Sequence, residues 1–150
     1  MREYFQTITR RFGLLSKTCC SVDGVDVSAV QSHILYEIQK NHNVSIQQLS
    51  EILGVDITTF SRQIQTLVKI GLVKKTPYSG DKRITLLGLT DIGDKVAIGI
   101  DQQVNQFLED IFMEMTEIER EDVQRSIRLL AKVMDNPSIR YQSYCSNDSC

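Results

Sequence analysis

Apolar residues recur every three or four positions through most of the chain, the spacing of helices that bury one face. In the first such helix the apolar face consists of Phe5, Ile8, Phe12 and Leu15. Capping-box patterns, Ser28-Ala-Val-Gln31 and Ser45-Ile-Gln-Gln48, begin the second and third helices. Gly54 ends the third, so the pattern predicts three helices before the middle of the chain.

A fourth helix follows the third almost without a loop. Only Val55 separates Gly54 from Asp56, which is a favourable N-cap. The helix ends at Gly71, and its apolar face is formed by Ile57, Phe60, Ile64, Leu67 and Val68. Two helices joined by such a short turn are typical of a helix-turn-helix.

After Gly71 the apolar period changes from 3.6 to 2. Residues 72–76 and 83–87 are therefore expected to form short strands, and the turn-rich loop 77–82 separates them. This pattern predicts a β-hairpin with a basic tip.

Helical spacing returns beyond Thr90. A long helix carries apolar residues at alternating steps of three and four, the pattern of a seam between paired helices: Ala97, Ile100, Val104, Phe107 and Ile111. The pattern Thr116-Glu-Ile-Glu119 begins a last helix, which ends before Pro137. Because so small a monomer has little room to bury this seam, we predict that the long helix forms a dimer interface with the first and last helices.

The predicted fold is mainly α with a small β-hairpin wing: a winged helix-turn-helix domain plus a helical dimerisation domain. Residues 28–90 form the winged domain. Residues 1–27, which include the Cys19-Cys20 segment, belong with the long helices of 91–136 to the dimerisation domain, and 137–150 form a flexible tail that contains cysteines.

The net charge of −2 conceals a strong asymmetry. Between Asp56 and Thr90 there are six Lys and Arg residues but two Asp, whereas between Asp101 and Asp122 there are eight acidic residues and one Arg. Because nucleic-acid binding depends on local charge, the middle of the chain can bind DNA despite the acidic total. Neither a signal peptide nor a membrane-spanning segment is present in the sequence, so we expect a cytoplasmic protein with no membrane partner.

The fourth helix has the composition of a recognition helix. Several polar side chains lie off its apolar face near the N-terminus, where they can reach base edges: Thr58, Thr59, Ser61, Arg62 and Gln65. Arg62 can pair with N7 and O6 of guanine, and a phosphate contact is its alternative role.

The hairpin tip supplies a second predicted contact. Lys82 and Arg83 can reach phosphates or insert into a narrow minor groove, where the potential is most negative. Asp81 would oppose binding if it faced phosphate, so we expect it to hold the arginine or the turn in place.

The wing sequence Asp81-Lys-Arg-Ile-Thr-Leu-Leu-Gly-Leu-Thr-Asp-Ile-Gly93 resembles the signature of the multiple antibiotic resistance regulator (MarR) family. Residues 49–54 and 68–73 are similar to what that family shows around its recognition helix, and the resemblance covers about residues 28–135. It implies a homodimer on a pseudo-palindromic operator in double-stranded DNA, with Arg83 in the minor groove. It also implies that the first, fifth and sixth helices form the dimerisation domain.

All four cysteines lie near the chain ends: Cys19, Cys20, Cys145 and Cys150. If the terminal helices form the dimerisation domain, these thiols can meet and bind a soft effector such as zinc, cadmium, copper or arsenite. We therefore expect a repressor that requires no cofactor and releases its operator when such an effector binds. Three alternatives remain open: thiol oxidation, incidental buried cysteines, and a small organic effector bound between the two regions.

A cysteine-based redox enzyme is the rival from another functional class, and we reject it. Such an enzyme needs a thiol of lowered pKa, whereas Cys19 and Cys20 are expected to follow a helix, where the dipole disfavours thiolate. The sequence also contains no Cys-x-x-Cys motif, phosphate-binding loop or His-Glu-x-x-His motif.

Overall fold

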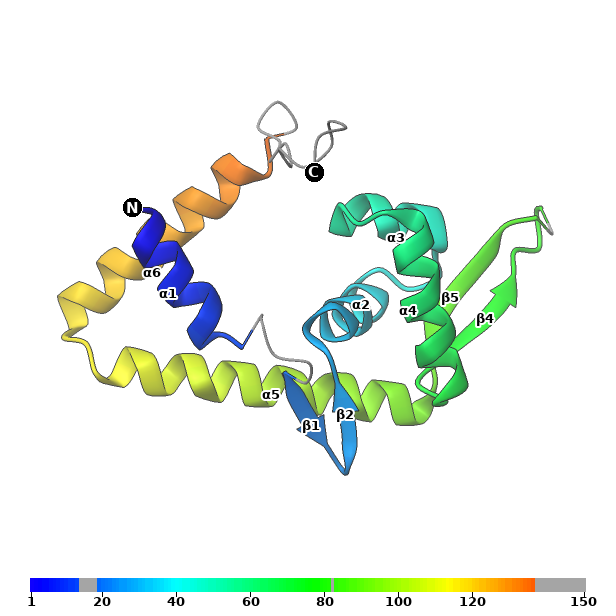
Figure 1. Cartoon of the computed structure of the whole chain (residues 1–150), viewed down its shortest axis with the longest axis horizontal. Helices are drawn as coiled ribbons and strands as arrows, with labels where there is room; N and C mark the ends of the chain where they lie inside the picture. The colour runs from blue at the N-terminus through cyan, green and yellow to red at the C-terminus, as the bar shows by residue number, and fades with distance from the viewer. Residues whose placement is uncertain (14–18, 82, 137–150) are drawn as a thin grey trace, which may run out of the picture. The chain divides into compact units, whose positions relative to one another are not determined.

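The computed structural model describes residues 1–13, 19–81 and 83–136 (Figure 1). The chain divides into two compact units, Met1–Gln106 and Phe107–Cys150. The elements in chain order are α1 (Arg2–Arg11), β1 (Cys20–Val22), β2 (Val25–Val27), α2 (Ala29–Lys40), β3 (Val44–Ser45), α3 (Ile46–Leu53), α4 (Ile57–Lys69), β4 (Val73–Pro77), β5 (Thr85–Leu89), α5 (Asp91–Met113) and α6 (Glu117–Met134).

The helix starts follow the predicted caps. At α2 the Ser28 hydroxyl accepts from the Gln31 amide at 3.3 Å, and the Gln31 side chain accepts from the Ser28 amide at 3.0 Å. The same reciprocal bonds begin α3 at Ser45 and α6 at Thr116. Because each pair satisfies backbone donors that the helix itself leaves unpaired, local sequence fixes where these helices begin.

The wing belongs to a three-stranded antiparallel sheet in the order β3-β5-β4. Its two long strands are displaced by one or two residues from the prediction of 72–76 and 83–87, because Pro77 still pairs with Thr85. Proline is tolerated there since β4 is an edge strand. The third strand, β3, pairs Val44 with Leu87 and was not predicted.

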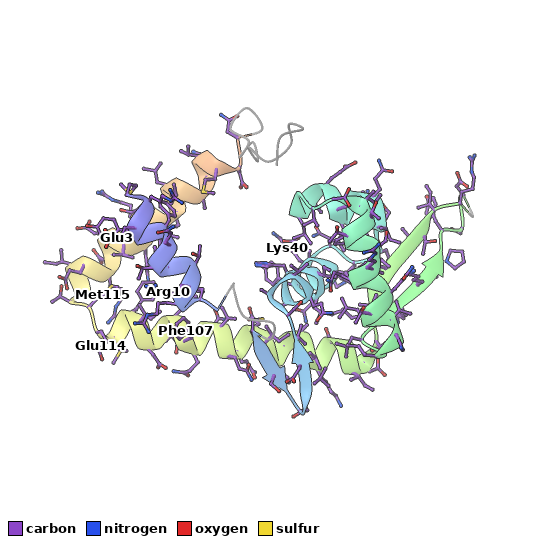
Figure 2. All side chains as sticks on the ribbon, viewed as in Figure 1. Glu3, Arg10, Lys40, Phe107, Glu114 and Met115 are labelled. Atoms are coloured by element: carbon purple, nitrogen blue, oxygen red, sulfur yellow. The ribbon has the colours of Figure 1, made fainter. Side chains whose placement is uncertain are left out.

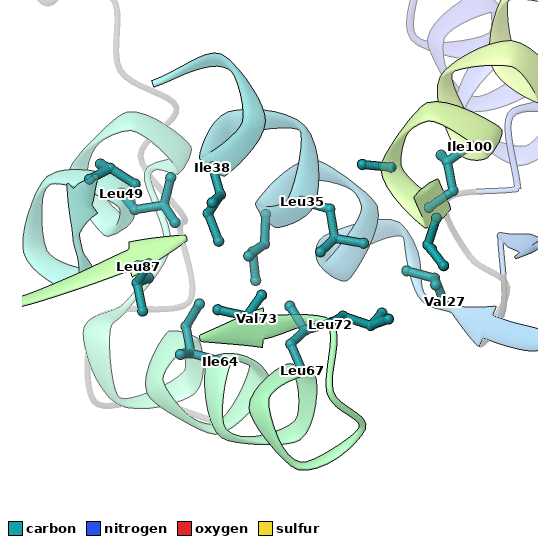
Figure 3. Close-up of a cluster of buried hydrophobic side chains, with 14 of the residues drawn as sticks. Val27, Leu35, Ile38, Leu49, Ile64, Leu67, Leu72, Val73, Leu87 and Ile100 are labelled. Atoms are coloured by element: carbon teal, nitrogen blue, oxygen red, sulfur yellow. The ribbon is translucent and has the colours of Figure 1, made fainter. Parts of the chain in front are cut away.

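One apolar core holds the first unit together (Figure 3). Its most deeply buried side chains come from α2, α3, α4, the sheet and the residue directly before β4: Ile34, Leu35, Ile38, Leu49, Phe60, Ile64, Leu67, Leu87 and Leu72. Val27, which closes the segment assigned to the dimerisation domain, is 1% exposed and packs in the same core. The core therefore fixes the helix-turn-helix against the wing.

The apolar residues along α5 that were predicted to pair with another helix differ in their burial. Ala97 and Ile100 are buried in the core of the first unit, so assigning them to a dimer interface was wrong. Val104 and Phe107, further along the helix, are 38% and 41% exposed. The start of α5 is thus part of the core, and only its later turns present apolar side chains outward.

An unpredicted hairpin, β1-β2, precedes α2. Its two-residue turn places Asp23 and Gly24 at φ values of +50° and +79°, which is type I′ geometry. The hairpin packs directly on α5, because a Cβ added to Gly99 would lie 2.6 Å from Val22 Cγ1. The Gln103 side chain also donates to the Ser21 carbonyl at 2.8 Å.

Two helices bury no residue of their own, although each carries apolar side chains. On α1 the exposed apolar residues are Tyr4, Phe5 and Ile8. Phe12, the C-cap of this helix, is also exposed, and Leu15 lies outside the described residues. On α6 they are Ile118, Ile127, Leu129, Leu130, Val133 and Met134. A turn at Glu114 and Met115 joins α5 to α6 (Figure 2).

Candidate nucleic-acid interface

The turn between α3 and α4 sets the start of the predicted recognition helix. Gly54 adopts a left-handed φ of +61° and ends α3. Asp56 then accepts hydrogen bonds from the Thr58 and Thr59 amides, each at 3.0 Å. These bonds, that from Thr59 first, hold the pKa of the Asp56 carboxyl below its ordinary value, so the cap is ionised at neutral pH.

The outer face of α4 is polar and accessible. Of the five residues predicted to face DNA, Ser61 is half-buried and the other four are exposed: Thr58, Thr59, Arg62 and Gln65. Phe60 and Ile64 on the opposite face are fully buried. The core therefore holds the helix by one side and leaves the donors on the other.

Sequence reasoning missed two residues of this face. Thr66 and Lys69 are exposed, and they lie four and seven positions after Arg62, on the same side of the helix. The Thr66 hydroxyl donates to the Arg62 carbonyl at 3.1 Å. Helical spacing alone could have found them, but the prediction considered only the first turns.

The wing tip holds its arginine through Asp81. Arg83 donates to Asp81 from its backbone amide at 3.0 Å, from Nε at 3.1 Å and from a terminal guanidinium nitrogen at 3.0 Å. These bonds, the side-chain ones first, lower the pKa of the Asp81 carboxyl. The Arg83 side chain is nevertheless 91% exposed, so its charge faces solvent. Lys82 lies outside the described residues.

A tight joint connects the wing to α5. The Thr90 hydroxyl donates to the Gly71 carbonyl at 2.6 Å and accepts from the Gly93 amide at 3.0 Å. A Cβ at Gly93 would lie 1.9 Å from the Leu72 carbonyl oxygen, a position that backbone already occupies. The Leu-Thr-x-x-Gly pattern is thus explained by a hydroxyl bridge and a close backbone approach.

The structure describes two of the four cysteines as free thiols, and Cys145 and Cys150 lie outside the described residues. The pair follows α1 in the sequence, as expected, but Cys20 begins β1 and does not lie in the last turn of that helix. Its sulfur lies 3.0 Å from that of Cys19. Burial, followed by the hydrogen bond with Cys19, raises the pKa of the Cys20 thiol to about 12.

No group of three His, Cys, Asp or Glu side chains in the described ranges could hold a metal ion. Over the same residues, the helices are all too short or too polar to cross a membrane.

An open hollow of about 660 Å³ lies between α2, the sheet and the start of α5. Its lining includes His42, Lys74 and Lys95. A hydrogen bond from Gln39 to Asp94, 2.9 Å long, joins two of its walls. The hollow offers charged and amide groups to a polar organic molecule.

The chain is similar in sequence to known transcriptional regulators. Residues 27–85 match the model of the MarR family. The multiple antibiotic resistance protein MarR of Escherichia coli is 30% identical over 111 residues, which cover 73% of this chain and 75% of that protein. The HTH-type transcriptional regulator YybA of Bacillus subtilis is 30% identical over 94 residues, which cover 59% of this chain and 63% of that protein.

Solved structures show the same fold. FabT of Streptococcus pneumoniae, solved in complex with DNA, matches with a TM-score of 0.79 and 20% identity over 90% of this chain and 95% of that one. A mutant of E. coli MarR in complex with operator DNA matches with a TM-score of 0.70 and 26% identity over 89% of this chain and 91% of that one. Because the chain matches the family model over residues 27–85 and is 30% identical to E. coli MarR across 75% of that protein, it belongs to the MarR family.

Proposed function

We propose that the protein is a homodimeric transcriptional regulator that binds a pseudo-palindromic operator in double-stranded DNA. The observation that carries this proposal is the polar, exposed face of α4, held at a fixed orientation beside a wing that presents Arg83. Similar proteins of this fold have been solved with DNA. A regulator of this kind acts in the cytoplasm as a binding protein and not as an enzyme.

Each DNA contact has a distinct chemical role. Arg62 lies at the centre of the exposed face of α4, where its guanidinium can pair with a guanine edge in the major groove. Thr58, Thr59 and Gln65 flank it and offer donors and acceptors to neighbouring bases or phosphates. Arg83 projects from the wing, and a narrow minor groove is the site that best stabilises its charge.

Dimerisation follows from the apolar side chains that α1 and α6 leave exposed. Neither helix buries a residue within the chain, although Ile118 on α6 is 75% exposed and Tyr4 on α1 is 68% exposed. Several exposed apolar side chains on one helix are typical of an interaction site. Because a two-fold dimer presents two recognition helices, its natural target is a pair of half-sites about one helical turn, or about 34 Å, apart.

Operator titrations test the DNA-binding mode. On a promoter fragment near the protein's own gene, Arg62→Ala is expected to lower affinity by about 10-fold and to relax preference at one base position. Arg83→Ala is expected to weaken binding at A·T-rich flanks and to reduce the salt dependence by about one ion. Lys74→Ala, on the exposed edge strand, is the matched control and should change neither property. Unchanged affinity in both arginine variants would refute this interface.

We further propose that the protein is a repressor whose operator binding is relieved by a soft metal ion or metalloid at its cysteines. Support comes from the 3.0 Å approach of the Cys19 and Cys20 sulfurs, since soft effectors select thiol ligands. Cys145 and Cys150 are the further ligands in this proposal, and they lie outside the described residues.

Effector titrations distinguish the open alternatives. Zinc, cadmium, copper(I), arsenite and peroxide are each added to the protein-operator complex, and each titration is repeated after Cys19→Ser and Cys20→Ser. Release by a metal or arsenite in the wild-type chain alone supports the proposal. Release by peroxide alone would indicate thiol oxidation. If none of the five releases the operator, small organic molecules bound in the hollow beside Gln39 become the candidates.

A further inference from the structure

The two adjacent cysteines point their sulfurs toward each other. Neighbouring residues within one strand direct their side chains to opposite faces, but β1 begins at Cys20, so Cys19 is free of that alternation. The Cys19 amide donates to the Val27 carbonyl at 2.9 Å, which ties the pair to the hairpin. The resulting 3.0 Å separation lets both sulfurs bind one soft atom, since sulfur ligands lie about 2.3 Å from such an ion.

Two other thiol chemistries do not suit Cys19 and Cys20 by themselves. A disulfide normally needs Cα atoms about 4.4–6.8 Å apart, whereas consecutive Cα atoms are about 3.8 Å apart. A structural zinc ion needs about four ligands, so Cys19 and Cys20 by themselves do not complete a zinc site, and zinc belongs to the proposal that includes Cys145 and Cys150. Zinc also requires thiolates, which the raised pKa of Cys20 opposes.

We propose that Cys19 and Cys20 together form a bidentate site for trivalent arsenicals that carry one organic substituent. The reaction with an arsine oxide forms two arsenic–sulfur bonds and breaks the arsenic–oxygen bond. Both thiol protons leave with that oxygen as one molecule of water, and the oxidation state of arsenic does not change. Because the reaction consumes thiols in their protonated form, it needs no thiolate at equilibrium.

The site is placed where occupancy would disturb α5. Cys20, Val22 and Val25 are partly buried on the inner side of the hairpin, packed against the core. The same hairpin touches α5 at Gly99 and is held there by the bond from Gln103. An arsenic atom and its substituent need space beside the sulfurs, but Cys20 is packed against the core there. Occupancy therefore loosens the hairpin from α5, and this regulatory step rests on the proposed DNA-binding function.

Stoichiometric binding of phenylarsine oxide tests the chelate without DNA. The full-length chain with Cys145→Ser and Cys150→Ser is expected to retain one arsenical per protomer by intact-mass measurement. 2,3-Dimercaptopropanol should remove it, whereas 2-mercaptoethanol at equal thiol concentration should not. Adding Cys19→Ser, Cys20→Ser or Cys20→Ala should each weaken binding by at least about 100-fold, because the second sulfur then no longer binds intramolecularly. Circular dichroism checks that each variant is folded.

Two results would overturn the chelate: retention that survives the loss of Cys19, or retention that requires Cys145 or Cys150. The regulatory step has its own readout, since one equivalent of phenylarsine oxide should reduce operator affinity by at least about 10-fold in the Cys145→Ser, Cys150→Ser chain. Chelation with unchanged operator affinity would refute coupling through the hairpin. Failure of the reduced, untreated protein to bind any operator would instead refute the proposed function, and the chelation result would stand.

Discussion

Arg83 combines an exposed charge with a restrained geometry. Its side chain is 91% exposed, yet three of its nitrogen donors, one of them the backbone amide, bond to the Asp81 carboxylate. Holding a flexible side chain in place before binding reduces the conformational entropy lost on the DNA. The same carboxylate repels phosphate, although salt screens that repulsion over about 10 Å. Asp81 therefore lowers the net positive charge of the wing, but it restrains the Arg83 side chain before DNA binds.

The Asp81–Arg83 pair predicts a specific titration. The pKa of the Asp81 carboxyl should lie below its ordinary value of 3.8, because the Arg83 donors favour the ionised form. A lowered folded-state pKa contributes stability that is fully present above the ordinary value and is lost as pH falls through the lowered one. The pair should thus stay intact between pH 8 and pH 5. Carboxyl NMR measures this pKa, which should return toward 3.8 in Arg83→Ala; identical values in both proteins would contradict the pairing.

Gly93 is predicted to tolerate no side chain. Gly93→Ala should lower the free energy of unfolding by at least about 2 kcal/mol, because the added Cβ meets the Leu72 carbonyl oxygen and neither backbone can easily shift. Urea denaturation measures the difference. Gly88→Ala is the matched control, since its Cβ would meet only the flexible Lys74 side chain at 3.4 Å. Equal stability of the two variants would show that the joint is looser than described.

At the scale of elements, helices were predictable because their signals are local. The caps at Ser28, Ser45 and Thr116 each satisfy backbone donors within three residues, so the sequence marks the starts directly. Short strands carry less information: β3 has two residues, and its pairing with β5 depends on contacts distant in sequence. Hairpin β1-β2 was missed although Asp23-Gly24 between valines is a strong turn signal.

In the candidate site, too, only features set by residues close together in the sequence were predictable. The polar face of α4 and the wing contact between Asp81 and Arg83 follow from spacing within a few residues. The burial of Cys20 does not, because it depends on packing between the hairpin and the core. The sequence therefore predicts which side chains share a face of one helix or one turn. The burial of a thiol cannot be predicted in this way, because it depends on how separate elements pack together.

The β1-β2 turn gives a prediction at this scale. Gly24→Ala should destabilise the hairpin by about 1 kcal/mol, since a φ of +79° is unfavourable for alanine. Hydrogen exchange of the Cys19 amide, which donates to Val27, should then accelerate by about 5-fold. Asp23→Asn is the control, because asparagine also suits a positive φ in this turn. Unchanged exchange in Gly24→Ala would mean that packing on α5 alone holds the hairpin.

At the scale of the whole molecule, helix α6 carries apolar side chains and buries none of them. Exposed apolar residues occur along α6. Four of them lie on one face of the helix, together with the half-buried Val123, and this face covers about one third of the circumference: Ile127, Leu130, Val133 and Met134. The acidic residues between Asp101 and Asp122 oppose DNA binding in this part of the chain. Charge and apolar patterning are thus consistent with the proposed DNA contact by the basic winged region and the proposed association through apolar helix faces.

Leu130→Glu is predicted to separate the dimer. A buried carboxylate without a partner is strongly unfavourable at an apolar interface, so the dimer dissociation constant should rise by at least about 100-fold. Light scattering coupled to size exclusion measures the mass of the species present, and operator affinity should fall in parallel. Arg128→Glu, on the polar side of the same helix, should remain dimeric. A dimeric Leu130→Glu protein would exclude this face from the interface.

The Thr90–Gly93 joint and the buried side chains of Val96, Ala97 and Ile100 fix the first turns of α5 to the wing and the core, so the helix and the winged region move together. At 23 residues the helix is about 34 Å long, so a tilt of about 5° at one end moves the other by about 3 Å. That displacement is comparable to the rise of one DNA base pair, about 3.4 Å. An effector that tilts this helix by a few degrees would put two recognition helices out of register with their half-sites, without altering any residue that touches DNA.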